Sequence, residues 1–384
     1  MFQRTSRKPY DAIIIGGGVV GISIAYHLVH QGINTLLFDR KDPGRATHAG
    51  AGILSPETSG FDSEAWFDLA VKAGNYYPIL IDQLQAQQAS NTGYTRCGIL
   101  TVAVTEDEIE HFERTKRLLF QRKKRRGQPT DDELQLVSTH EAQSLFPCLA
   151  PVHNAIYCHS AARVDGQLLT HALQLSSEAQ GLNILESSVD KLILQGRRIM
   201  GVMAEGGAFY ADKVVVAGGA WSQAYGMQLG IRIPVEPQRG QIMHFSMKNV
   251  DTDNWPIVSA FHGHYIVSWP RGHIVVGATR ETNSGYEPQC TANGIYEIVG
   301  EALRVAPGLA QAELETVRVG LRPIIKDKLP ILSSVPFIDN LYVATGHGGS
   351  GLLLGPYSGK IMAQLMLGQD IETDITAFTI ARFL

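Results

Sequence analysis

Three glycines near the start of the chain have the spacing of a turn that holds phosphate groups. Gly16, Gly18 and Gly21 form the pattern G-x-G-x-x-G between two apolar runs. In such a pattern the first glycine permits a tight turn, the second lets the backbone approach a pyrophosphate, and the third lets a helix pack closely on a strand. The unpaired N–H groups and the partial positive charge at the start of that helix stabilise phosphate oxygens. The spacing therefore predicts a dinucleotide-binding turn.

An acidic residue lies where the ribose of a dinucleotide is expected. Asp39 follows the glycine pattern by about twenty residues, where its carboxylate can accept hydrogen bonds from ribose hydroxyls. An acid at this position favours an unphosphorylated ribose, and so FAD or NAD rather than NADP. Further glycine-rich segments follow later apolar runs, at residues 218–219 and 346–351. A long cofactor that lies across a whole sheet needs these extra close approaches of the backbone, which favours FAD.

A strand, a helix and a second strand must position these residues. Residues 10–15 predict a buried strand, residues 19–31 have helical spacing and stop at a glycine, and residues 35–38 predict a second buried strand. Together they form a βαβ unit. The uncharged run 12–29 also approaches the length of a membrane span or a signal peptide, and basic residues precede it. The glycines within it, Asp11 before it and the lack of a small-residue cleavage site favour the buried unit, and we expect a cytoplasmic protein.

Composition limits the remaining classes of function. The chain has 384 residues, which suits two domains, and 33 Lys and Arg against 37 Asp and Glu give a net charge of −4. This balance argues against a general nucleic-acid or anionic-membrane binder. The cysteines, at positions 97, 148, 158 and 290, show no C-x-x-C pair and no Cys/His metal spacing. We therefore expect free thiols in a reducing compartment and no metal site.

The rest of the pattern predicts an α/β protein of two domains. Apolar runs of parallel-strand type occur at the start, middle and end of the chain, and antiparallel runs lie between them. We expect a discontinuous nucleotide-binding domain at residues 1–88, 154–224 and 319–384, and a sheet-based second domain at 89–153 and 225–318. The further strands are expected at 98–104, 183–189, 191–194, 213–217, 242–245, 265–269, 274–279 and 341–345, and the further helices at 65–88, 106–126, 168–180, 293–306 and 352–367.

Several segments, taken together, resemble the D-amino-acid oxidase superfamily of flavoproteins, and most of all its glycine oxidase branch. The resemblance runs nearly end to end, and it implies an α/β two-domain fold with a Rossmann-like FAD domain of the p-hydroxybenzoate-hydroxylase type and an antiparallel-sheet substrate domain. It also implies that FAD binds non-covalently, because His48 lies one residue out of register with histidines that bond to the flavin in some branches. The segments are DAIIIGGGVVG, ATHAGAGILSP, VVVAGGAWS, PVEPQRGQ, HYIVSWPR, HIVVGATRE, GLRPIIKDKLPIL and GHGGSGLLLGP.

The resemblance assigns residues around the whole cofactor. Independently of the family, a glycine-rich turn before a helix can aim N–H groups at the negative charge of a reduced flavin, although an ordinary strand–helix turn has the same composition. The assigned residues are Gly16, Gly18, Val19, Val20 and Gly21 at the pyrophosphate; Asp39 and Arg40 at the adenosine ribose; Ala46, Thr47, Ala51, Gly52 and Ile53 in the flavin loop; Val189 at the adenine; Gly218; and His347, Gly348, Gly349, Ser350, Gly351 and Leu352 over the isoalloxazine ring.

The resemblance also assigns a substrate site. Arg322 matches the arginine that holds the substrate carboxylate, for which a planar guanidinium is suited because it forms two parallel charge-assisted bonds. Tyr265 matches a substrate-lining tyrosine, whose phenol can bond the same carboxylate, although tyrosines on strands are often only core residues. Of the two histidines before it, His262 and His264, we expect His264 to face the pocket. We assign no catalytic acid or base.

The implied reaction is the oxidative deamination of a small amino acid or secondary amine, such as glycine, sarcosine or a D-amino acid. A hydride passes from Cα of the neutral amine to flavin N5, the imino acid hydrolyses to a 2-oxo acid, and O2 is reduced to hydrogen peroxide. The chain departs from the family at Gly349, which stands where glycine oxidases carry a second substrate-binding arginine. This departure leaves the substrate open and predicts a roomier pocket that admits a larger or an N-substituted amino acid.

Two other functions are compatible with the same fold. One is an amino-acid dehydrogenase that passes electrons to a quinone or a carrier, and the basic run 122–126 (Arg122, Lys123, Lys124, Arg125, Arg126) would then dock on a membrane rather than form a solvated helix end. The other is a tRNA-modifying flavoenzyme, which the net charge disfavours. We also expect a homo-oligomer that binds small molecules and no nucleic acid.

Overall fold

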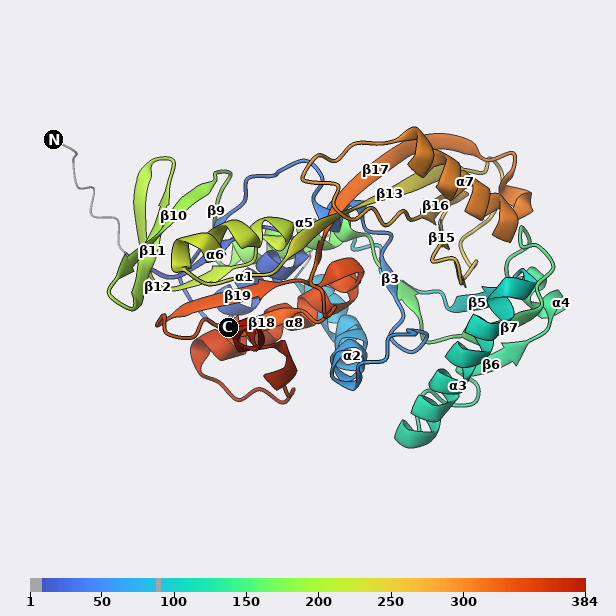
Figure 1. The fold of residues 1–384 in the computed structure, drawn as a ribbon, viewed down its shortest axis with the longest axis horizontal. Helices are drawn as coiled ribbons and strands as arrows, with labels where there is room; N and C mark the ends of the chain where they lie inside the picture. Colours follow the sequence, from blue (N-terminus) through green and yellow to red (C-terminus); the bar gives the residue numbers. More distant parts are fainter. Residues whose placement is uncertain (1–8, 88–90) are drawn as a thin grey trace.

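The first sheet is built around parallel strands that are buried on both faces. The computed structural model describes residues 9–87 and 91–384 (Figure 1). The strand order is β10-β11-β12-β1-β2-β9, and β19 and β18 continue the sheet from β12; β1, β2, β9, β12 and β19 pair in parallel. The strands are β1 (Tyr10–Ile15), β2 (Thr35–Phe38), β9 (Asn183–Leu185), β10 (Val189–Gln195), β11 (Arg198–Ala204), β12 (Gly207–Val216), β18 (Ile331–Ser334) and β19 (Leu341–Thr345).

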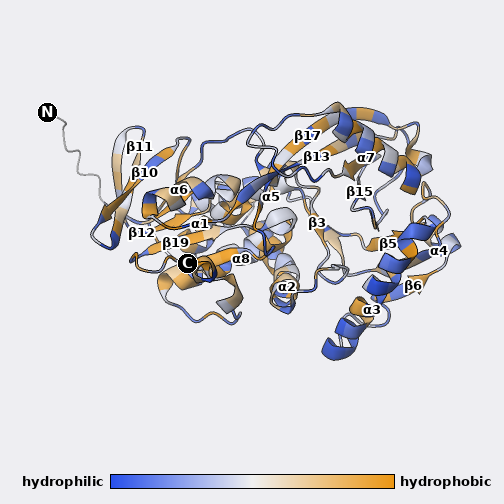
Figure 2. Ribbon diagram, viewed as in Figure 1, coloured by the Kyte–Doolittle hydropathy of each residue, from blue (hydrophilic) through white to orange (hydrophobic). Residues whose placement is uncertain are grey.

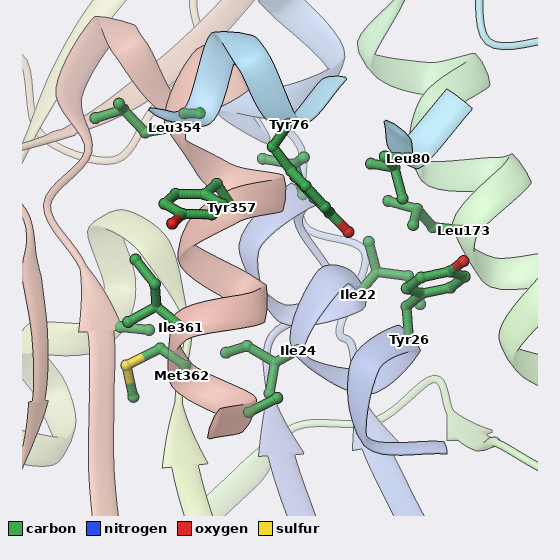
Figure 3. Close-up of a cluster of buried hydrophobic side chains, with 14 of the residues drawn as sticks. Ile22, Ile24, Tyr26, Tyr76, Leu80, Leu173, Leu354, Tyr357, Ile361 and Met362 are labelled. Atoms are coloured by element: carbon green, nitrogen blue, oxygen red, sulfur yellow. The ribbon is translucent and has the colours of Figure 1, made fainter. Parts of the chain in front are cut away.

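Four helices cover one face of this sheet. They are α1 (Val19–Val29), α2 (Glu64–Ala86), α5 (Gly166–Ala179) and α8 (Gly351–Leu367), and Figure 3 shows their apolar side chains meeting in one cluster. Glycines let α1 and α8 approach, because a Cβ on Gly359 would lie 2.4 Å from Cβ of Ser23. Along β1, Ile14 joins this cluster, whereas Ile13 and Ile15 join a second cluster on the opposite face. Burial of both faces is typical of parallel strands.

The second sheet is antiparallel except where β14 pairs in parallel with β5. Its order is β17-β13-β16-β15-β14-β5-β7-β6, and α7 (Ala292–Val305) and α4 (Thr139–Leu145) pack on its main core cluster. A small third sheet joins β3 (Ile53–Leu54), β8 (Ala162–Arg163) and β4 (Thr95–Arg96). The strands of the second sheet are β5 (Ile99–Ala103), β6 (Leu134–Val137), β7 (Asn154–Cys158), β13 (Glu236–Ser246), β14 (Ile257–Ala260), β15 (Tyr265–Trp269), β16 (His273–Gly277) and β17 (Glu313–Ile324).

The predicted α/β fold with a second, sheet-based lobe is confirmed, but the second sheet is larger than we expected. The sequence analysis missed β17, which pairs with β13 from Glu236 opposite Ile324 to Ser246 opposite Glu313. The exact division of the chain into domains stays a proposal. β7 (Asn154–Cys158) lies within the range proposed for the nucleotide-binding domain but pairs in the second sheet. β17 runs across the proposed boundary at residue 319.

The basic run 122–126 ends α3 (Ile109–Arg126), which is the most hydrophilic helix in Figure 2. Contrary to the expectation of a solvated helix end, the Arg122 side chain is buried, donates to the carbonyl of Ser59 at 2.7 Å and stacks on Phe67. Lys123, Arg125 and Arg126 each pair with a carboxylate. These internal partners leave little free charge for a membrane, so the membrane contact stays a prediction without structural support.

The apolar run 12–29 forms β1, a turn and α1 rather than one long helix. No helix in the described part of the chain combines the length and the apolar character that crossing a bilayer requires.

Candidate functional site

The glycine turn between β1 and α1 is shaped to admit a ligand backbone. Gly16 donates to the carbonyl of Phe38 at 2.7 Å and has a φ of +110°, and a Cβ on it would lie 2.5 Å from the carbonyl oxygen of Ala217. A Cβ on Gly21 would lie 1.9 Å from the Gly16 carbonyl oxygen, so Gly21 closes the turn from below rather than lining it. α1 begins after Gly18, which carries no capping side chain. The N–H of Val19 donates to Oγ1 of Thr47 at 3.1 Å, and the partial positive charge at the start of α1 suits an anionic group.

One cavity of about 330 Å³ runs from this turn to the second sheet. The cavity passes the end of β2 and the loop that contains η1 (Ala46–Ala49), and it then passes η3 (Gly219–Ser222). It reaches Tyr265, Arg322 and the start of α8. The predicted cofactor residues line it except for Gly21, which lies beneath the turn, and Ser350, whose N–H donates to the carbonyl of His347 at 3.0 Å. The shape fits a long dinucleotide, with an anion-binding turn at one end and a cation at the other.

Asp39 is held in place by a residue that the sequence analysis missed. Arg45 pairs with the Asp39 carboxylate at 2.8 Å and donates to the carbonyl of Gly17 at 3.3 Å. A Cβ on Gly17 would lie 2.6 Å from Oδ2 of Asp39, so this position also needs glycine. Arg40 pairs with Asp42 at 2.6 Å on the cavity wall. Arg45 lies in a loop of small residues, and no spacing in the sequence marks it.

The last glycine-rich loop is supported from behind. Nε2 of His347 lies 3.0 Å from Oγ of Ser358, and burial lowers the pKa of His347 to about 4, so the imidazole is neutral near pH 7. The hydroxyl of Thr345 donates to the carbonyl of Gly219 at 2.8 Å. η5 (Gly348–Ser350) then leads into α8, and Ser350, the residue before the helix, makes no side-chain cap. The N-terminus of α8 thus lies at the cavity and suits negative charge there.

At the other end of the cavity, Arg322 is half-buried and pairs with no carboxylate of the described residues. Its Nη1 donates to the carbonyl of Thr279 at 2.8 Å, and the hydroxyl of Tyr265 lies next to the guanidinium. Burial lowers the pKa of Arg322 and raises the pKa of Tyr265, and each group partly offsets the shift of the other. In the part of the chain that the structure describes, Arg322 forms no ion pair. A half-buried cation of this kind is stabilised by an anionic ligand.

Two glycines that the sequence analysis missed make room for these side chains. A Cβ on Gly240 of β13 would lie 2.4 Å from Nη1 of Arg322, and a Cβ on Gly277 of β16 would lie 2.7 Å from the Tyr265 hydroxyl. Gly349 faces Arg322 from the last loop, where a Cβ would have its nearest neighbours, Cδ and Nε of Arg322, at 3.9 Å. A Cβ at position 349 would therefore touch Arg322 without a clash, and glycine leaves that volume to the cavity.

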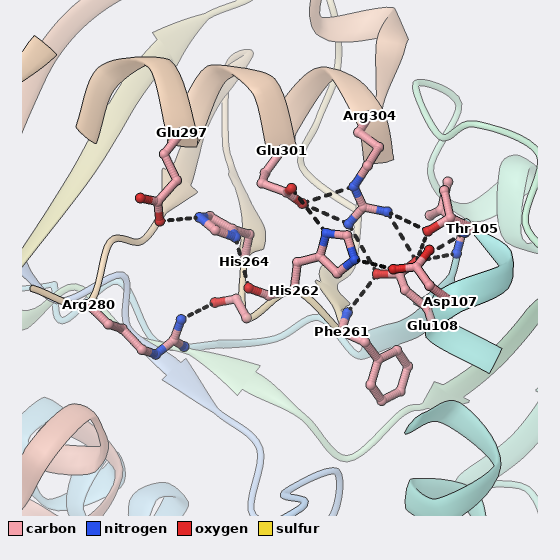
Figure 4. A network of polar contacts seen from close by, with 12 residues as sticks. Thr105, Asp107, Glu108, Phe261, His262, His264, Arg280, Glu297, Glu301 and Arg304 are labelled. Carbon is pink, nitrogen blue, oxygen red and sulfur yellow. Dashed lines mark hydrogen bonds and ion pairs between the residues drawn. The ribbon is translucent and has the colours of Figure 1, made fainter. Parts of the chain in front are cut away.

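His264 is the one predicted substrate residue that the structure does not bring to the cavity. It is buried beneath α7, where Nε2 lies 3.3 Å from Glu297 and Nδ1 lies 3.2 Å from the carbonyl of His262 (Figure 4). Burial lowers the pKa of His264 more than the nearby glutamates raise it. Side chains alternate between the two faces along an extended chain. Because Tyr265 faces the cavity, His264, the residue before it, faces the other side.

The fold and the site together define a flavin-dependent oxidoreductase, and comparison with known proteins agrees. The chain belongs to the family described as "FAD dependent oxidoreductase" (DAO), which matches residues 11–365. The predicted family and its cofactor, FAD, are thereby confirmed. As in the glycine oxidases of this family, the chemistry is oxidation of an amine donor.

Three relatives show how close the likeness is. "Uncharacterized oxidoreductase YurR" of Bacillus subtilis (strain 168) is 37% identical over 95% of this chain and 97% of its own length. The solved structure of iminodiacetate oxidase (IdaA) from Chelativorans sp. BNC1 has a TM-score of 0.90 and 34% identity, over 96% of this chain and 98% of that one. The structure of glycine oxidase from Geobacillus kaustophilus has a TM-score of 0.88 and 26% identity, over 98% and 99%.

Proposed function

We propose that the enzyme oxidises the Cα–H bond of a small amino acid or an N-substituted glycine, and that O2 takes up the electrons. The observation that carries the proposal is Arg322, a half-buried cation that lines the cavity and forms no ion pair with the described residues. Its planar guanidinium can bind a carboxylate through two parallel bonds, and the Tyr265 hydroxyl stands beside it. This clamp would fix the α-carbon of the substrate relative to the cofactor.

The chain's own residues bind and orient both molecules. The turn at Gly16 and Gly18 would hold the diphosphate, and the start of α8 would stabilise negative charge on the ring. Bound FAD supplies a two-electron acceptor for the Cα hydride, after which water converts the product imine into a carbonyl compound and an amine or ammonia. Among the described residues that line the cavity, the carboxylates are Asp39, Asp42 and Asp190, near the adenosine end. With no carboxylate lining the cavity beside Arg322, the substrate amine would arrive deprotonated.

The open space at Gly349 supports a substrate that extends beyond glycine. A second arginine at this position would stand against Arg322, and its absence leaves room for a substituent on the nitrogen or on the α-carbon. The likeness to iminodiacetate oxidase favours a substituent on the nitrogen. N-substituted glycines such as sarcosine and iminodiacetate are therefore the first compounds to test, followed by glycine and D-amino acids.

Substitution of Arg322 tests this proposal. Arg322→Gln should raise KM for a carboxylated amine by about a hundredfold, because a charge-assisted pair of bonds is lost, and Arg322→Lys should recover only part of the loss. Oxygen uptake and peroxide formation measure the activity, and flavin absorbance reports whether the variant still holds FAD. The proposal fails if Arg322→Gln binds FAD and oxidises the same amine with unchanged KM. Reduction of an artificial dye without oxygen uptake would instead identify a dehydrogenase.

A further inference from the structure

A second arginine, Arg280, stands beside the substrate clamp. It follows Thr279, whose carbonyl accepts the bond from Arg322, and its Nη1 donates to the carbonyl of Gly263 at 2.6 Å. Gly263 lies two residues before Tyr265 in the sequence. Arg280 thus follows Thr279, one neighbour of Arg322, and bonds the loop that leads to Tyr265, the other neighbour. Figure 4 shows its side chain reaching Gly263 on the side of the loop away from α7.

The Gly263 loop is shaped around the Arg280 guanidinium. Gly263 has a φ of +85°, and a Cβ on it would lie 2.5 Å from Nη1 of Arg280, so only glycine offers both the carbonyl and the room. One bond to a carbonyl orients a guanidinium but leaves most of its five donors free. Arg280 is exposed and is not among the residues that line the cavity, so its donors can meet a group that projects out of the cavity.

Arg280 and Arg322 are close enough to influence each other, yet no protein carboxylate pairs with either in the described ranges. The charge of Arg280 lowers the pKa values of both Tyr265 and Arg322. Glu281, the nearby carboxylate that favours charged Arg322, pairs with Arg239 at 2.6 Å and accepts from Gln241 and Thr279. Two like charges held near one another without a counter-ion oppose each other. An anion between or beside them would remove this repulsion.

Resting on the proposed function, we infer that Arg280 binds a second anionic group of the substrate, so that the enzyme prefers a dicarboxylic amine to a monocarboxylic one. Arg322 holds the carboxylate on the carbon that is oxidised, and Arg280 holds the carboxylate on the far end of the substituent. The open space at Gly349 gives the substituent room. The second substrate-binding cation would thus come from the segment after β16, and not from the last glycine-rich loop at residues 346–351.

A matched pair of substrates tests this inference in the FAD-bound enzyme. Iminodiacetate and sarcosine share the N-substituted glycine unit, and only iminodiacetate has the second carboxylate. The inference predicts that Arg280→Gln lowers the ratio of kcat/KM for iminodiacetate to kcat/KM for sarcosine by about tenfold or more, mainly through KM for iminodiacetate. Arg280→Lys should keep part of the preference, because it keeps the charge. Arg117→Gln, the same change at an exposed position on α3, should leave the ratio unchanged.

A binding comparison in the unmodified enzyme covers the case in which Arg280→Gln fails to fold. Glutarate should perturb the flavin spectrum at about a tenfold lower concentration than butyrate, because only glutarate can reach both arginines. Equal affinity for glutarate and butyrate would overturn the inference, and so would an unchanged substrate ratio in folded Arg280→Gln. If iminodiacetate, sarcosine, glycine and D-amino acids all leave the flavin oxidised, the proposed function fails, and the glutarate comparison still decides the role of Arg280.

Discussion

Single glycines decide whether the cavity exists at all. At Gly240 and Gly277 the missing side chain leaves the space that the Arg322 guanidinium and the Tyr265 phenol occupy, and at Gly16 it lets the turn lie against the carbonyl of Ala217. Only Gly16 could be recognised in the sequence, because its neighbours in the motif are local. Gly240 meets Arg322 only after β13 and β17, which are far apart in the sequence, have paired. Gly277 meets Tyr265 across the neighbouring strands β15 and β16, where the register of the pair decides which residues face each other.

Gly16→Ala should abolish FAD retention. The added Cβ would lie 2.5 Å from the carbonyl oxygen of Ala217 in a backbone conformation with φ of +110°, so the turn must shift away from its ligand-binding shape. Gly32→Ala is the matched control, because Gly32 also has a positive φ, of +76°, but has no atom within 4 Å of the added Cβ. The control should cost about 1 kcal/mol in stability and keep its flavin. Equal flavin-to-protein absorbance in the two purified variants would contradict this account of the turn.

At the scale of elements, local units could be predicted and long-range pairings could not. The unit of β1, α1 and β2 has continuous apolar runs and a glycine turn, and it forms where we expected. β17 begins with exposed residues and carries its buried ones near the end, so it lacks the alternation that marks a strand. His264, which lies just before β15, contacts Glu297 of α7, and no local pattern in the sequence marks that contact.

A buried ion pair ties α7 to the segment before α3. The carboxylate of Glu108 in η2 (Glu106–Glu108) is fully buried and pairs with Arg304 at 3.1 Å, and it also accepts from the N–H groups of Val104 and Phe261 (Figure 4). Phe261 begins the loop that contains Gly263. This network therefore fixes the loop on which both Tyr265 and Arg280 depend.

Arg304→Met should lower the free energy of unfolding by about 3 kcal/mol, because it leaves the buried Glu108 carboxylate without its cation. Adding Glu108→Gln to Arg304→Met should recover part of the loss. Lys248→Met removes an exposed pair with Glu313 and should cost less than about 1 kcal/mol. Urea unfolding of the three proteins measures these differences. A loss in Arg304→Met no larger than that in Lys248→Met would show that the buried pair does not stabilise the fold.

At the scale of the whole molecule, the two sheets supply opposite ends of one cavity. The first sheet presents glycine turns and helix N-termini, which suit the negative charge of a dinucleotide, and the second presents Arg322 and Tyr265. Buried neutral histidines contribute to both lobes, since His347 lies in the last loop and His244 lies on β13. Burial lowers the pKa of His347 to about 4 and that of His244 to about 3.

These histidines predict that stability falls in mild acid. Above pH 6.5 the two imidazoles are neutral in both the folded and the unfolded chain, so their contribution is complete. As the pH falls from 6.5 toward 4, the unfolded chain binds protons that the folded chain does not, and each histidine lowers the free energy of unfolding by up to about 1.4 kcal/mol per pH unit. Urea unfolding at pH 7.5, 6 and 5 measures the slope, which His244→Gln should reduce. A free energy of unfolding that stays constant over this range would contradict the neutral burial of both residues.

The central claim is that an amine held by Arg322 reduces FAD bound across the cavity. Anaerobic titration of the purified holoenzyme with iminodiacetate, sarcosine, glycine and D-amino acids, followed by admission of air, tests it most directly. The account predicts that at least one of these carboxylated amines bleaches the flavin absorbance and that air restores the absorbance with formation of peroxide. A protein that binds FAD but keeps its oxidised spectrum with every one of these amines would contradict the claim.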